Sequence, residues 1–183
     1  MVLENDICVV EIDVDETYTL DSADNRYYDE VLNPSNYTRN DFTRTLAICI
    51  DTFSKHISIA LIGSSLIGDF DCAVLDNNIL TVLLDQEIVQ INVTDASIAR
   101  HIKLDGSGCN FGIYKVEKGY IVYGETEITM LGFDFEKKWA FSGKDIFVSI
   151  SGKSPFEIMK NSISLYDFEN NYYEIDYEGK QIL

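Results

Sequence analysis

The pattern of hydrophobic and polar positions predicts short strands along most of the chain, and three stretches repeat the same pattern. Each stretch holds four strand-like segments in about 30 residues, and the stretches cover residues 71–104, 111–143 and 155–183. They recur about every 40 residues, which is the spacing of a four-stranded propeller blade. The pattern therefore predicts an all-β fold of consecutive antiparallel four-stranded meanders, arranged as a small or incomplete β-propeller.

The repeat is clearest at the third segment of each stretch. Residues 87–93 (EIVQINV) align with residues 127–133 (EITMLGF), and the match in the third stretch is looser. The second segment of the first stretch is almost entirely apolar, which is typical of an inner strand covered on both faces. The predicted strands are residues 72–75, 79–84, 88–93 and 99–104, then 111–116, 120–123, 128–133 and 138–141, and finally 156–159, 163–166, 172–177 and 180–183.

Residues 1–70 are predicted to form a more irregular and acidic β unit. Residues 45–51 and 56–62 are two apolar segments on either side of a polar turn, which is the pattern of a hairpin. Three blades do not close a propeller, because typical propellers have four to eight. Either this unit supplies a fourth blade, or the sheets stay open with their edges capped, or a dimer covers the edges. At 183 residues the chain has the size of one domain, and we expect one domain over residues 1–183.

The link between the third and fourth segments carries a resemblance to known repeats. In the last stretch, Asp176, Gly179 and Lys180 match the D-x-x-G-K-x-x-W edge of quinoprotein-type and WD-type propeller repeats, with Leu183 in place of the Trp. This resemblance covers residues 71–183 in pattern. It implies a propeller-like fold, and it implies no activity.

The other two stretches depart further from that edge. The second keeps Asp134 and Lys138 but has Phe141 at the Trp position, and the first keeps neither the Gly nor the Lys. The chain also resembles small uncharacterised bacterial proteins in which the sequence Phe-Ser-Gly-Lys-Asp-Ile-Phe, here residues 141–147, follows such an edge. Trp139 falls two residues before the motif position, and we expect it to pack in the core or between blades.

Charge narrows the possible partners. The net charge is −17, so the surface repels nucleic acid and anionic membranes and attracts basic proteins. Residues 7–15 alternate so that carboxylates share one strand face, and a further acid follows them. We expect this face to bind a basic partner; the alternatives are a solvated face and calcium chelation, although the segment lacks the Gly and closing Glu of an EF-hand. The predicted partner-binding residues are Glu11, Asp13, Asp15 and Glu16.

The other motifs of the sequence indicate no catalytic, metal-binding or phosphate-binding site. His56 and His101 each lie in a strand-like segment, and no Cys and His spacing indicates a zinc site. The Gly-rich residues 106–112 lack the G-K-[ST] of a phosphate-binding loop and read as a connection between repeats. We therefore predict no catalytic residue, no metal and no cofactor. The sequence lacks an evident signal peptide or membrane span and has no paired Cys motif, so we expect a cytoplasmic protein with reduced thiols.

The favoured function is a non-enzymatic acidic protein-binding module. One concrete version is an immunity-type inhibitor that masks a basic toxin, such as a nuclease, by mimicking phosphate charge. The alternative is a small-ligand or carbohydrate-binding protein, or a hydrolase, with a site at a blade mouth; a purely structural subunit is a third possibility. The sequence leaves the oligomeric state open.

Overall fold

The computed structural model describes residues 1–38, 44–64, 71–106, 108–149 and 152–183. These residues form sixteen strands, no helix, and four sheets with three to five strands each, so the predicted all-β class is confirmed. The chain divides into two compact units, residues 1–105 (unit 1) and residues 106–183 (unit 2). Because the described residues contain no helix, they hold no helix that could cross a membrane.

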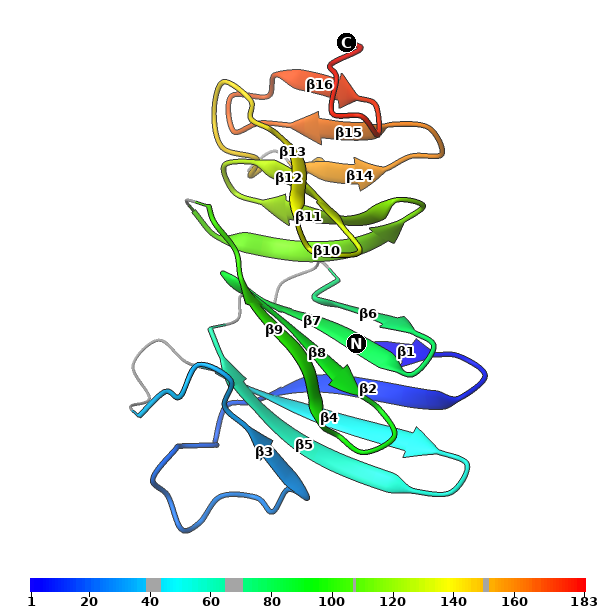
Figure 1. Cartoon of the computed structure of the whole chain (residues 1–183). Coiled ribbons are helices and arrows are strands. Elements are labelled where there is room, and N and C mark those ends of the chain that lie inside the picture. Colours follow the sequence, from blue (N-terminus) through cyan, green and yellow to red (C-terminus); the bar gives the residue numbers. More distant parts are fainter. Residues whose placement is uncertain (39–43, 65–70, 107, 150–151) are drawn as a thin grey trace. The chain divides into compact units, whose positions relative to one another are not determined.

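Sheet A, in unit 1, is the five-stranded sheet of the N-terminal region (Figure 1). All its neighbours are antiparallel except β3, which runs parallel to β5 at one edge. The predicted hairpin is confirmed as β4 and β5, but the parallel edge strand makes this sheet different from a four-stranded meander. In sheet order, the strands are β1 (Val2–Glu4), β2 (Cys8–Asp15), β4 (Arg44–Thr52), β5 (His56–Gly63) and β3 (Glu30–Leu32).

Sheet B completes unit 1 and matches the first predicted repeat to within about two residues at each strand end. It is an antiparallel meander with strands in chain order. Apolar side chains of sheets A and B form one buried cluster, which includes Ile48 and Leu61 from sheet A and Val82 from sheet B. The two sheets therefore pack face to face (Figure 1). The strands are β6 (Ala73–Asp76), β7 (Ile79–Leu84), β8 (Glu87–Asn92) and β9 (Ile98–Lys103).

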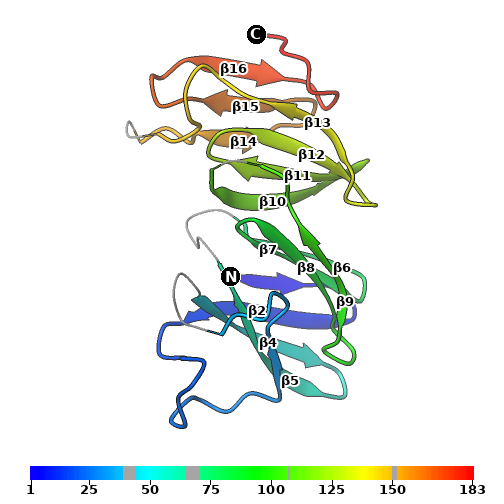
Figure 2. The same ribbon diagram turned by 60° about the vertical axis from the view of Figure 1, so that its left-hand side comes forward.

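Sheets C and D form unit 2 and correspond to the second and third repeats (Figure 2). Sheet C is a four-stranded meander, whereas sheet D has three strands. The predicted fourth strand of sheet D is reduced to one bridge between Ile175 and Gln181. The strands are β10 (Asn110–Val116), β11 (Gly119–Gly124), β12 (Ile128–Gly132) and β13 (Lys137–Phe141) in sheet C, and β14 (Phe156–Ile158), β15 (Ile163–Tyr166) and β16 (Tyr172–Ile175) in sheet D.

Aromatic side chains join sheet C to sheet D. The ring of Tyr123 stacks on Phe156 with 4.7 Å between centroids. Trp139 donates a hydrogen bond from Nε1 to the carbonyl oxygen of Tyr177 at 3.1 Å, and its ring covers Gly179 in the turn after β16. Trp139 therefore packs between two sheets, as the sequence predicted.

Candidate protein-binding surface

The alternation along β2 places its carboxylates on one side of sheet A, which we call the outer face. Glu11 and Asp13 are exposed there, while the intervening Ile12 points into the core. The strand register sets Glu11 opposite Cys49 and Asp13 opposite Ala47 of β4. The predicted acidic row is thus formed by two exposed carboxylates on a regular strand.

Asp15 lies at the end of the same row but has a structural role. Its Oδ1 accepts hydrogen bonds from the hydroxyl and backbone N–H of Thr17 at 2.6 and 3.0 Å, and from the backbone N–H of Tyr18 at 3.1 Å. Its Oδ2 accepts a hydrogen bond from the hydroxyl of Tyr28 at 2.7 Å. The Thr17 and Tyr28 side-chain hydrogen bonds lower the pKa of Asp15. Glu16, the next residue, is exposed in the turn that these bonds hold.

Tyr28 covers part of the outer face. Its ring is buried with Ala47 and Ala60, and it contacts Tyr18 edge to face at 5.9 Å between centroids. Arg26 lies over the ring of Tyr28, 5.4 Å from its centroid. Burial raises the pKa of Tyr28, and its hydrogen bond to Asp15 adds to the shift. Tyr18 and Tyr28, which precede β3 in the chain, therefore cover part of the outer face beside the acidic row.

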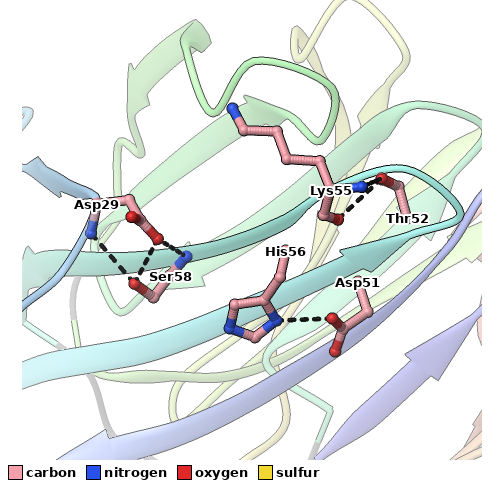
Figure 3. Close-up of polar contacts among 6 residues, drawn as sticks. All are labelled: Asp29, Asp51, Thr52, Lys55, His56 and Ser58. Atoms are coloured by element: carbon pink, nitrogen blue, oxygen red, sulfur yellow. Dashed lines mark hydrogen bonds and ion pairs between the residues drawn. The ribbon is translucent and has the colours of Figure 1, made fainter.

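Further charged side chains lie on the outer face near the β4–β5 hairpin (Figure 3). The Oδ1 of Asp51 contacts Nδ1 of His56 at 2.6 Å, and both side chains are more than half exposed. Asp51 is opposite Val9 in the register, and Glu4 of β1 is opposite Val9 on its other side. Glu4, Asp51 and His56 therefore share the outer face with Glu11 and Asp13.

Ser58 and Asp29 form a separate pair on this face (Figure 3). The hydroxyl of Ser58 donates to Oδ2 of Asp29 at 2.7 Å, and the backbone N–H of Ser58 donates to the same oxygen at 2.8 Å. The hydrogen bond from the backbone N–H of Ser58 lowers the pKa of Asp29 most, and the hydrogen bond from the Ser58 hydroxyl lowers it further. In a Ser-His-Asp triad the serine hydroxyl must be bonded to the histidine. Here it is bonded to a carboxylate, so the pair does not have the order of that triad.

The turn between β4 and β5 carries an exposed apolar side chain. The hydroxyl and backbone N–H of Thr52 donate to the carbonyl oxygen of Lys55, both at 2.9 Å, and thereby close the turn (Figure 3). Phe53, inside this turn, is 97% exposed. An aromatic ring so exposed is a natural anchor for a protein partner. The sequence analysis did not single it out, although its place in a polar four-residue turn was visible.

Sequence reasoning also missed a polar cluster in unit 1. Glu87 is buried, its Oε1 accepts a hydrogen bond from the Ser35 hydroxyl at 2.5 Å, and its Oε2 contacts Nε2 of His101 at 3.0 Å. The carboxylate separates the serine from the histidine, so this is again not the order of a catalytic triad. The cluster joins the segment after β3 to sheet B, and it is a structural tie.

Two further features of the sequence are its potential metal-ligating side chains and its Gly-rich connection. Among the described residues, no group of three or more His, Cys, Asp and Glu side chains could hold a metal ion. Of the Gly-rich connection, Ser107 lies outside the described residues, and Gly108 has a φ of +84°, as a turn requires. A cavity of about 450 Å³ lies in unit 2 and is lined partly by lysines.

No protein-family model and no curated protein matches this chain. The resemblance to quinoprotein-type and WD-type repeats therefore stays a prediction.

Proposed function

We propose that this protein is a non-enzymatic, acidic protein-binding module that engages a basic partner through the outer face of sheet A. One observation carries the proposal: exposed carboxylates from three strands share one sheet face, and an exposed acid and an exposed aromatic ring lie in turns that directly follow two of these strands. The carboxylates on the face are those of Glu4, Glu11, Asp13 and Asp51, and the turn residues are Glu16 after β2 and Phe53 after β4.

The charge distribution supports this choice of face. Unit 1 has nineteen Asp and Glu against six Lys and Arg, a formal charge of −13, whereas unit 2 has twelve against eight, a charge of −4. A concentrated negative field accelerates the approach of a basic protein and orients it before contact. Phe53 would then supply the apolar contact that carries much of the binding energy at protein interfaces.

The same features support an immunity-type inhibitor as the specific form of the module. A nuclease or similar toxin binds phosphate through Lys and Arg side chains, and a rigid sheet with a row of carboxylates can occupy those side chains. In this proposal the repeated meanders are blades of a propeller-like scaffold and the protein acts in the cytoplasm.

The test is capture of partners from the cell that makes the protein, at low and at high salt. Glu11, Asp13 and Glu16 are replaced together by Lys, and Asp15 is kept because its carboxylate holds the turn at Tyr28. We expect the wild type to retain a basic protein at low salt and release it at high salt, because exposed charges are screened within about 10 Å at 0.1 M salt. The triple variant should retain it at least about tenfold less well.

The matched control carries the same change in charge elsewhere. Asp71, Glu157 and Glu169 are exposed acids that belong to no strand of sheet A, and their replacement by Lys leaves the residues of the outer face unchanged. The control should retain the partner almost as well as the wild type. If both variants lose the partner equally, net charge alone accounts for the binding. If the wild type retains no basic protein that salt releases, the proposal is contradicted.

A further inference from the structure

Unit 2 contains a cavity that is lined by more lysines than acids, although the chain as a whole is strongly acidic. It has a volume of about 450 Å³, within the range of small-ligand sites. Its walls come from the β10–β11 turn in sheet C, and from the β14–β15 turn and the turn after β16 in sheet D. All the lining residues belong to unit 2, and none belongs to sheet A.

The floor of the cavity is apolar. Met130 of β12 is 4% exposed, and Val116 and Ile158 are half-buried. Tyr177 adds its ring, which is fixed because its hydroxyl donates a hydrogen bond to the carbonyl oxygen of Met159 at 2.8 Å. Burial raises the pKa of Tyr177, so the side chain stays neutral. Such a floor favours a hydrocarbon or aromatic body over a fully polar ligand.

Three lysines stand at the rim. Lys118 forms an ion pair with Glu178 at 2.9 Å, and Lys115 lies 6.0 Å from the ring centroid of Phe133. Lys160 forms no ion pair within the described part of the chain, although it belongs to a protein with 31 acids. An ammonium beside an apolar cavity is placed to meet an anionic group of a ligand whose body fills the floor.

We propose that this cavity binds a small amphipathic carboxylate, with the carboxylate at Lys160 and the apolar body on Met130, Ile158 and Tyr177. Lysine is a flexible point charge and suits a single anionic group, whereas phosphate sites usually add Arg forks or rows of backbone N–H groups. The rim has no arginine. The two rim glutamates, Glu117 and Glu178, disfavour ligands with several negative charges.

The experiment is a titration of ¹⁵N-labelled full-length protein with 4-phenylbutyrate, followed by amide chemical shifts. The neutral alcohol 4-phenylbutan-1-ol and inorganic phosphate are titrated in parallel. We expect 4-phenylbutyrate to shift amides of the β10–β11 and β14–β15 turns, and to bind about two- to fivefold more tightly than the alcohol. Phosphate should leave these amides unchanged at the same concentration.

Two variants test the role of Lys160. Lys160→Gln removes the charge, and Asn161→Glu places a carboxylate next to it on an exposed rim position; each should weaken 4-phenylbutyrate binding about two- to fivefold. Lys144→Gln is the control, because Lys144 is exposed and does not line the cavity. Amide spectra of each variant without ligand establish that it is folded. The proposal would be overturned if the alcohol bound as tightly as 4-phenylbutyrate, or if both rim variants bound 4-phenylbutyrate as tightly as the wild type. It would also be overturned if millimolar 4-phenylbutyrate shifted no amides.

Discussion

At the scale of single residues, the acidic row of β2 contains two different kinds of carboxylate. Glu11 and Asp13 are exposed on a strand, whereas Asp15 accepts four hydrogen bonds that hold the next turn and Tyr28. The alternation of the sequence predicts that these side chains share a face. It does not predict which of them the fold itself uses, because the donor from Tyr28 comes from thirteen residues further along the chain.

Asp15 should make the stability of the protein depend on pH. Its pKa is below the ordinary value of 3.8, so it stabilises the fold above that pH, and the contribution is lost as the pH falls through the folded pKa. We expect Asp15→Asn to lower the free energy of unfolding by about 1–2 kcal/mol at pH 7. The difference from the wild type should shrink below pH 4. Urea unfolding of both proteins across pH 3–7 measures it, and a difference that is constant with pH would count against this role.

At the scale of elements, the turn after β16 is the contact through which sheet D meets Trp139 of β13. Gly179 in this turn has a φ of +79°, and an added Cβ would lie 2.6 Å from the Trp139 ring. The turn is further fixed by Asp176, whose Oδ1 accepts hydrogen bonds from the backbone N–H groups of Glu178 and Lys180. A glycine is therefore required here both by the backbone and by the ring above it.

Replacing Gly179 should reveal both requirements. Gly179→Ala is expected to cost about 2–4 kcal/mol, because it adds a steric conflict with Trp139 to the cost of a left-handed backbone. Gly152 has a similar φ of +76° but no heavy atom within 4 Å of an added Cβ, so Gly152→Ala should cost only about 1 kcal/mol. Denaturant unfolding followed by Trp fluorescence compares the two. Equal losses would mean that the contact with Trp139 contributes nothing.

The strands of the repeats could be predicted because their signal is local. The strands β6, β7 and β8 are largely apolar runs bounded by turns, and the predicted and observed bounds of β6 to β9 agree closely. The fourth strand of sheet D is different: residues 180–183 add only Ile182 and Leu183 as apolar side chains, and both are exposed. Nothing buries that segment, so it forms one bridge. The parallel pairing of β3 with β5 has no local signal, since it depends on a long connection.

At the scale of the molecule, charge is the property that links sequence to the proposed function. The sequence gives the net charge of −17 and shows that the N-terminal region is acidic, whereas the limits of unit 1 come from the fold. The acidic row could be predicted from alternation. Its neighbours Glu4 and Asp51 could not, because only the pairing of β1, β2 and β4 brings them to the same face.

The most direct test of the central claim is a carboxylate footprint of the complex captured at low salt. Exposed carboxylates are coupled to glycine ethyl ester with a carbodiimide, in the free protein and in the complex, and the labelled residues are quantified by mass spectrometry. The account predicts that labelling of Glu11, Asp13 and Glu16 falls on binding, while that of Glu157 and Glu169 is unchanged. Unchanged labelling of the acidic row, or protection confined to unit 2, would contradict the claim that sheet A binds the partner.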